Sequence, residues 1–202
     1  MTKDLIRMNY KEMNTLDEGL TEHFHQGYEI IFITEGKARF IVNDEPGIYS
    51  KNSVVFINNL VKHRMSLEQV PYSRYMIIID SSFFNDFIQI PEIHLLFKSK
   101  QQNFQNGVLI EPEDMAYVKD KIVHLQNIYD QKKHYWKYEF IANLFSLLIF
   151  IIREYPQNFP TQTIDRNTLL MIRIQQFIDS HFRSDITLEK LADEFFMSKY
   201  HL

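Results

Sequence analysis

The sequence predicts an α+β protein with a β-barrel first, a pair of helices next and an incomplete helical segment last. Residues 1–82 hold short runs of Val, Ile, Phe and Tyr between turn residues, a pattern typical of a barrel or sandwich. The chain then changes to helical periodicity, which a proline-containing polar stretch interrupts near residue 160. We therefore expect four regions: a barrel over 1–110, a helical pair over 111–156, a linker over 157–167 and a helical domain over 168–202.

Composition limits the possible functions only loosely. The chain has 202 residues, of which 24% are charged, and its net charge of −4 gives no bulk electrostatic basis for binding nucleic acid. Cysteine is absent, which excludes disulfides, thiolate metal ligands and a cysteine nucleophile, and fits a cytoplasmic protein. The longest apolar run, 140–152, is shorter than the roughly 20 residues that span a bilayer, so we expect no membrane partner.

The strands of the barrel can be placed from apolar runs and turn residues. We expect Gly36 to end one strand, and Asp44, Pro46 and Gly47 to form the turn after the next. Residues 82–97 have a mixed pattern that predicts short helices broken at Pro91. The clearest strand runs are 28–36, 37–42, 53–59 and 75–80.

Two longer helices follow. The first begins near Pro112, and its apolar residues from Met115 to Tyr129 recur at steps of three and four, which places them on one seam. The second runs from about Trp136 to Tyr155 and is apolar over most of its circumference, so it must be covered on more than one side. We expect one side to pack on the barrel and the other on a partner subunit, as a homodimer. The residues assigned to dimerisation are Ile122, Leu125, Ile141, Phe145 and Leu148.

A cluster of metal-capable residues lies early in the chain. His23, His25 and Glu29 have the spacing that places alternate residues of a strand on one face, and His63 comes one hairpin later. Three imidazoles and a carboxylate suit a first-row divalent ion. The spacing His-x-His-x3-Glu-x6-Gly resembles the first motif of the cupin barrel, and "NSVVFINNLVKH" resembles its second motif. Two departures are the missing glycine six residues before His23 and the missing Pro and Gly before His63.

The cupin resemblance leaves three interpretations of this cluster. The favoured one is a small-molecule effector pocket that holds no metal or other cofactor and is lined by His23, His25, Glu29 and His63, with Tyr10 and Phe40 beside them. The alternative is a metal-dependent cupin enzyme, a dioxygenase or isomerase, in which His23, His25, Glu29 and His63 are the ligands. A purely structural role of the same residues is the third.

The C-terminal stretch "DITLEKLADEFFMSKYHL" has the pattern of a helix-turn-helix. Thr187 is placed to cap a helix with Leu188, Leu191 and Ala192 on its packing face, and Ser198 is placed to begin a recognition helix. The stretch resembles the first helix-turn-helix of AraC/XylS-type transcription regulators, although such patterns also occur in generic amphipathic helix pairs. The order of barrel, helical pair and helix-turn-helix is the layout of that family. It implies a non-enzymatic regulator that binds an effector and promoter DNA, with Ser198, Lys199 and Tyr200 as the DNA-binding residues.

One departure from the AraC/XylS layout concerns DNA binding. The family's DNA-binding region has two helix-turn-helix units, whereas only one begins here. Residues 166–202 contain five Lys or Arg and five Asp or Glu, so the segment is neutral. Because DNA affinity comes mostly from neutralised phosphates, we expect no specific DNA binding by this chain alone and assign promoter DNA to the full-length regulator.

Overall fold

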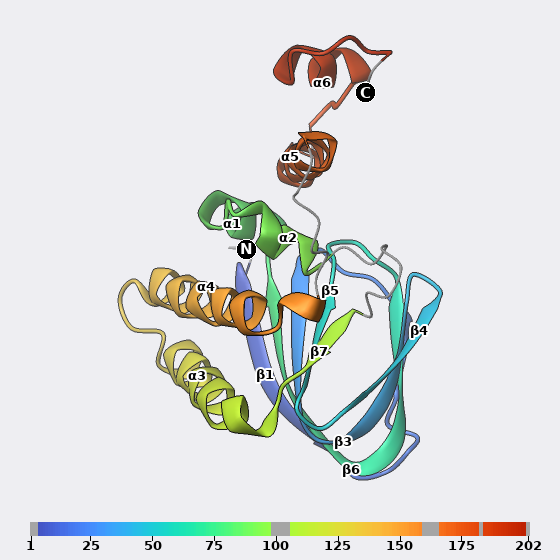
Figure 1. Cartoon of the computed structure of the whole chain (residues 1–202), viewed down its shortest axis with the longest axis vertical. Coiled ribbons are helices and arrows are strands. Elements are labelled where there is room, and N and C mark those ends of the chain that lie inside the picture. Colours follow the sequence, from blue (N-terminus) through green and yellow to red (C-terminus); the bar gives the residue numbers. More distant parts are fainter. Residues whose placement is uncertain (1–3, 98–105, 159–165, 182–183, 201–202) are drawn as a thin grey trace.

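The computed structural model describes residues 4–97, 106–158, 166–181 and 184–200. One seven-stranded antiparallel sheet rolls into a barrel, two long helices cover its outside, and two further helices lie beyond one end of it (Figure 1). The strands are β1 (Ile6–Met13), β2 (Leu20–His23), β3 (Tyr28–Val42), β4 (Glu45–Ser50), β5 (Ser53–Ile57), β6 (His63–Ile79) and β7 (Gly107–Leu109). The helices are α1 (Ser81–Phe87), α2 (Pro91–Leu95), α3 (Pro112–Gln131), α4 (Trp136–Glu154), α5 (Arg166–His181) and α6 (Leu188–Glu194), with a 3₁₀ turn at Pro156–Asn158.

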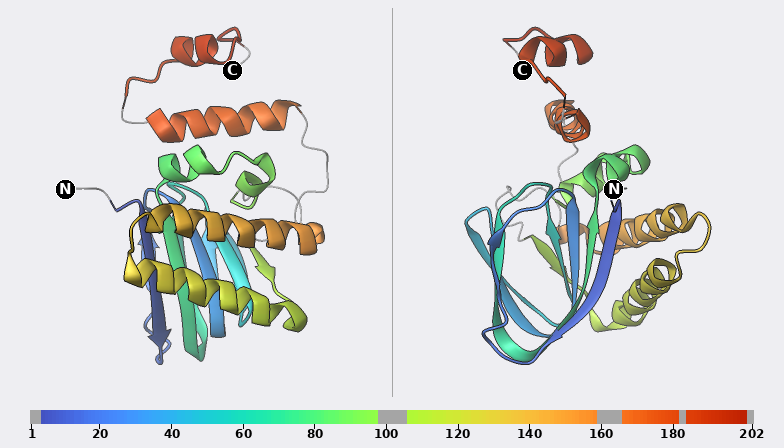
Figure 2. Two further views of the ribbon diagram at one scale, coloured as in Figure 1. Left: turned by 90° about the vertical axis from the view of Figure 1, so that its left-hand side faces the viewer. Right: turned by 180° about the vertical axis from the view of Figure 1, so that it is seen from behind.

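The strands β3 and β6 form the frame of the barrel. They pair antiparallel from Tyr28 opposite Ile79 to Val42 opposite His63. The sequence predicted that Gly36 ends a strand, and this is wrong: β3 continues through Gly36, whose φ of +77° accompanies shifts of register that bend both strands. Glycine adopts this φ without steric penalty, so it bends the strand and leaves the pairing on each side intact. The two long strands can therefore curve around a lumen (Figure 2).

The turn after β3 is tighter than the sequence predicted. Only Asn43 and Asp44 connect β3 to β4, with φ of +50° and +66°. Two positive φ values match the right-handed twist of a two-residue hairpin, and Asn and Asp tolerate them well. Pro46 and Gly47 lie in β4, opposite Ile41 and Phe40, and do not form the turn.

Two separate hydrophobic clusters follow from the alternation of side chains along the strands. One face of the sheet packs against the helices through residues such as Ile30, Phe32 and Phe56. The opposite face encloses the lumen with residues such as Ile31, Ile33 and Phe40. Since neighbouring residues of a strand point to opposite faces, each long strand contributes to both clusters.

The long helices occupy the predicted positions, and the predicted seam of α3 faces the sheet. They lie side by side across the outer face of the barrel (Figure 2). The assignment of their apolar residues to a dimer interface is wrong for most of them, because their side chains are at most 3% exposed in the chain's own core. Only Phe145 is partly exposed. The four buried residues are Ile122, Leu125, Ile141 and Leu148.

The C-terminal segment, residues 166–200, begins with α5, which lies next to α1 and α2 (Figure 1). Most of the predicted linker, 159–165, lies outside the described residues. The predicted cap of α6 is confirmed, since Lys190 N donates a 3.2 Å hydrogen bond to Thr187 Oγ1. The recognition helix predicted to begin at Ser198 is absent from the part of the segment that the structure describes. Ser198, Lys199 and Tyr200 there are exposed and not helical.

None of the helices in the described part of the chain is both long enough and apolar enough to cross a membrane.

Candidate functional site

The predicted cluster assembles at one end of the barrel from three separate pieces of chain. His23 ends β2, His25 lies in the turn to β3, and His63 begins β6 opposite His23. The sequence predicted that His23, His25 and Glu29 lie on one continuous strand. This is wrong, because the chain leaves the strand conformation between residues 23 and 28. Gly27, with a φ of +115°, turns the chain there. The side chains nevertheless converge, because the turn brings His25 back toward the start of β3.

Glu29 is the centre of the cluster. Its Oε2 lies 2.9 Å from His25 Nε2 and 3.1 Å from His63 Nε2. Burial by itself would raise the pKa of Glu29, but the hydrogen bonds and charges of His25 and His63 lower it to about 2. Burial likewise would lower the pKa of His63, but the Glu29 carboxylate raises it above its ordinary value. A buried carboxylate is therefore held ionised by the imidazoles around it.

Backbone carbonyls orient two of the imidazoles. Nδ1 of His63 donates to the Val61 carbonyl oxygen at 2.9 Å, and Nδ1 of His23 donates to the Thr21 carbonyl oxygen at 2.9 Å. Each ring therefore turns its Nε2 away from the backbone. In histidines that act as ligands, such a hydrogen bond from the other ring nitrogen to a carbonyl oxygen fixes the orientation of the ring.

The lumen beside the cluster contains two buried polar residues that the sequence analysis did not identify. Arg74 is 3% exposed, and its Nη1 lies 3.8 Å from Glu29 Oε1. Tyr72, on the same face of β6, is fully buried, and burial raises the pKa of its hydroxyl. Among the described residues, no hydrogen-bond partner exists for Arg74 Nε and Nη1, Tyr72 Oη or His25 Nδ1. The signal in the sequence was the alternation Tyr72, Arg74, Met76, which places a guanidinium on the lumen face.

The two aromatic residues predicted to line the pocket differ in their positions. Phe40 is 1% exposed inside the lumen and packs against Tyr49 with ring centroids 5.8 Å apart. Tyr10 does not face the lumen: it is 44% exposed and donates a 2.7 Å hydrogen bond to Glu12. It pairs with Tyr75 of β6, which lies on the face opposite Arg74, so strand parity excludes Tyr10 from the pocket.

The donor set of the cluster is compatible with a metal ion. One nitrogen from each of His23, His25 and His63 can be chosen so that all three lie within 4.8 Å of one another. Three neutral imidazoles suit zinc or another first-row ion, and three protein ligands leave a position open. Glu29 already contacts His25 and His63, so a bound ion would have to compete with it for both rings.

Comparison with known proteins identifies a match to a ligand-binding domain. Residues 12–104 match the family described as the AraC-like ligand binding domain. Among curated proteins, none matches the chain in sequence.

The fold of nearly the whole chain is also found in ToxT from Vibrio cholerae. An apo ToxT variant is 18% identical with a TM-score of 0.53, and the match covers 99% of this chain and 73% of that one. ToxT bound to an unsaturated fatty acid is 16% identical with a TM-score of 0.52, covering 98% and 71%. ToxT bound to a methylnaphthalenyl butenoic acid is 15% identical with a TM-score of 0.51, covering 98% and 73%. At these identities the likeness shows a shared fold.

Proposed function

We propose that this chain is the sensing part of an AraC-type transcription regulator and that a small-molecule effector enters the barrel lumen. The observation that carries the proposal is the group of buried polar atoms around Glu29 and Arg74. A buried guanidinium or hydroxyl without a hydrogen bond destabilises a fold by about 1–3 kcal/mol per group, so such groups are retained where they have a binding role. His23, His25, Glu29 and His63 form one wall of this site, and Phe40 belongs to its apolar lining.

The chemistry of the lumen favours an effector with acceptor oxygens. Arg74 offers N–H donors and Tyr72 offers a hydroxyl from the same face of β6. A carboxylate accepts from both kinds of donor, and a guanidinium matches its geometry. The two ToxT ligands named above are carboxylic acids, which is consistent with this choice.

Thermal unfolding with an unsaturated fatty acid and with short carboxylates tests the proposal. Binding at a ligand concentration about 100 times Kd stabilises the chain by roughly 2.7 kcal/mol, which a shift of Tm detects. We expect the shift in the wild type and its loss in Arg74→Met. Arg39→Met is the matched control, because Arg39 lies outside the lumen in a 2.7 Å ion pair with Glu68 and is 41% exposed. Equal shifts in both variants would contradict binding at Arg74.

A metal-dependent function is the second candidate, and the three converging imidazoles favour it. Elemental analysis of the purified chain decides between the two. Stoichiometric metal that is lost in both His25→Ala and His63→Ala, but retained in the control His124→Ala on the exposed side of α3, would favour a metalloprotein. Metal-free, folded protein would favour the sensor.

DNA binding and dimerisation complete the proposed regulator. We assign promoter binding to the full-length protein through a helix-turn-helix that includes α6 and residues Ser198, Lys199 and Tyr200. A gel shift in which this chain alone bound DNA with sequence selectivity would overturn the expectation that it lacks specific affinity.

We propose that the homodimer forms through the outer side of α4. The residues that the sequence analysis assigned to the interface are mostly buried in the core of the chain itself and are not available. A hollow of about 240 Å³ there is lined by apolar and small side chains and by Arg153 at its edge. Analytical ultracentrifugation of Ile149→Glu tests this side, since Ile149 is 36% exposed. A dimer that persists in this variant would place the interface elsewhere. The control is Val123→Glu on α3, also exposed but outside the hollow.

A further inference from the structure

Polar contacts form a distinct part of the attachment of helix α5 to the barrel. Of its described side chains, only Ile172 and Asp179 are fully buried. Burial of Ile172, the one fully buried apolar side chain, contributes about 1.5–3 kcal/mol. The remaining attachment depends on how the buried carboxylate is satisfied.

Asp179 is 3% exposed and accepts hydrogen bonds from both sides of the contact. Its Oδ1 accepts from Asn59 Nδ2 at 2.9 Å and from Gln175 Nε2, on its own helix, at 3.0 Å. Its Oδ2 accepts from the Tyr28 hydroxyl at 3.4 Å. Asn59 and Tyr28 belong to the barrel, so a carboxylate of α5 is solvated by the domain that senses.

Asn59 connects this carboxylate to the histidine cluster. While its Nδ2 donates to Asp179, its Oδ1 accepts from the Gly27 backbone N–H at 2.7 Å. Gly27 lies in the turn that carries His25, and the His25 carbonyl oxygen in turn accepts from Leu60 N at 3.1 Å. One buried side-chain amide thus bridges the turn of the cluster and helix α5.

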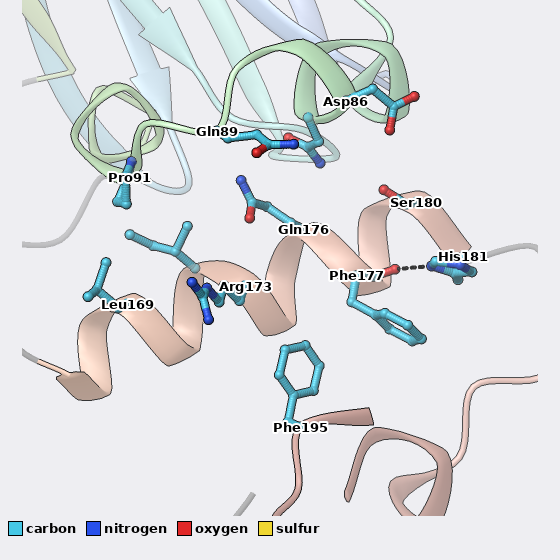
Figure 3. Close-up of a pocket in the computed structure, with 12 residues that line it drawn as sticks. Asp86, Gln89, Pro91, Leu169, Arg173, Gln176, Phe177, Ser180, His181 and Phe195 are labelled. Carbon is cyan, nitrogen blue, oxygen red and sulfur yellow. Dashed lines mark hydrogen bonds between the residues drawn. The ribbon is translucent and has the colours of Figure 1, made fainter. Parts of the chain in front are cut away.

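The surroundings leave space for α5 to move. A cleft of about 390 Å³ separates α5 from α1 and the start of α2 (Figure 3). In it, Gln176 points from α5 toward the barrel side, where its amide nitrogen lies 2.7 Å from His94 Nε2. Phe177 points the other way, toward Phe195 of the same C-terminal segment, with ring centroids 5.9 Å apart. The segment therefore has its own apolar contact, which is retained if α5 leaves the barrel.

We propose that Asn59 and Asp179 form a latch that holds the C-terminal segment against the barrel and makes the turn of His25 and helix α5 move together. The regulatory consequence rests on the proposed function: an effector that displaces the His25 turn withdraws the Gly27 N–H donor that orients Asn59, and so releases α5. Coupling of this kind acts in both directions, so loosening α5 must also loosen the turn. Asn59 and Asp179 are positioning residues and do not touch the effector.

An exchange of the two side-chain types tests the latch. Asn59→Asp keeps the acceptor for Gly27 N but places two carboxylates against each other, so we expect α5 to be released. Adding Asp179→Asn returns an amide donor between the two side chains. The two bonds that join Gly27, position 59 and position 179 can then form again, although Gln175 Nε2 loses its acceptor, so we expect docking to be restored. Asp193→Asn, an exposed residue of α6 in the same segment, is the control.

The chain has no cysteine, so spin labels on Asp120→Cys in α3 and Met171→Cys in α5, both exposed, report the docking distance without further changes. We expect a narrow distance distribution in the parent chain, in the exchanged pair and in the control, and a broad one in Asn59→Asp. A narrow distribution in Asn59→Asp, or a broad one that the exchange does not restore, would overturn the latch.

Hydrogen exchange of the Gly27 amide measures the reverse direction. Asp179→Leu changes only the C-terminal segment, so it leaves the barrel able to fold even if Asn59→Asp does not. We expect Gly27 to exchange about tenfold faster in Asp179→Leu, which corresponds to one lost hydrogen bond of average strength. Unchanged exchange would refute the coupling. No effector or DNA is present in either measurement, so failure of the proposed function would leave these results standing.

Discussion

The two faces of strand β3 bury different kinds of side chain on opposite sides of the same stretch of sequence. Ile30 and Phe32 face the helices in a core made mainly of apolar side chains. Glu29, one residue earlier, faces the lumen, where it meets two histidines and Arg74. The backbone pairing and the burial are the same on both faces. The faces differ in what they bury, which is mainly apolar side chains toward the helices and a group of charged side chains toward the lumen.

That difference separates the two roles. Burial of apolar surface stabilises without requiring any partner of defined geometry. Burial of charged groups stabilises little and is often unfavourable compared with an apolar replacement, so its retention points to another use. This contrast agrees with the proposal that the helix-facing side serves stability and the lumen side serves ligand recognition.

The largest expected effect tests the helix-facing side. Leu125→Ala on α3 should lower the free energy of unfolding by about 3–4 kcal/mol, because Leu125 is fully buried and its loss leaves a cavity. Urea denaturation measures the change. Val123→Ala on the exposed side of the same helix, where Val123 is 37% exposed, should change it by about 0.5 kcal/mol or less. A small effect of Leu125→Ala would mean that the helices are not anchored through this core.

A somewhat smaller loss is expected when the lumen charge is removed. Glu29→Gln keeps the shape of the side chain but leaves Arg74 and the histidines without their counter-charge, so we expect about 2–4 kcal/mol of destabilisation in the same urea experiment. The matched control is Glu68→Gln, which breaks the exposed ion pair with Arg39 and should change stability by about 0–1 kcal/mol. Equal losses of stability in Glu29→Gln and Glu68→Gln would contradict the view that the lumen charge differs from a surface charge.

Removal of two tyrosine hydroxyls, one outside the lumen and one inside it, also tests the difference between the two faces. Tyr155→Phe should destabilise by about 1–2 kcal/mol, because its hydroxyl donates to Asp114 at 2.6 Å and accepts from Glu111 N at 3.0 Å. Tyr72→Phe in the lumen should be neutral or stabilising by up to about 1 kcal/mol, since its buried hydroxyl has no partner among the described residues. A marked loss of stability in Tyr72→Phe would show that a bound water or another group satisfies this hydroxyl.

The smallest effect concerns pH and α5. Burial raises the pKa of Asp179 above its ordinary value of 3.8, so ionisation opposes docking. Docking should therefore tighten as the pH falls from neutrality through the raised pKa and level off below 3.8. Spin-label distances at several pH values measure it. The other charged or titratable groups described at this contact are Tyr28, Asp86, His94, Arg173 and His181. The comparison is therefore made with Asp179→Asn, which should remove the dependence assigned to Asp179.

Local chemistry explains which elements were predictable. The helix from Pro112, the cap at Thr187 and the short helices around Pro91 each depend on residues within one turn of each other, and all three are confirmed. The prediction at Gly36 failed because a glycine with positive φ can either end a strand or bend it. Only pairing with a distant strand decides which occurs. The dimer residues failed for a related reason, since periodicity identifies an apolar stripe but not what covers it.

Some residues of the candidate site were also predictable from the sequence, and others were identified only by the structure. Spacing alone brought His23, His25, Glu29 and His63 into consideration, and the structure brings them together. Strand parity excluded Tyr10, and it added Arg74, because the register of β6 decides which residues face the lumen. No pattern in the sequence indicated the contact between Asn59 and Asp179, because they are 120 residues apart and neither belongs to a motif in its own segment.

The sequence by itself determined the order of a barrel, a helical pair and a further helical segment, together with the residue types of the cluster. These depend on periodicity, turn residues and capping, which act over a few residues. Only the tertiary structure decided which atoms share the lumen, which apolar faces are already covered and how α5 is held. Those outcomes depend on strand register and long-range packing, where a shift of one residue reverses the face that every side chain occupies.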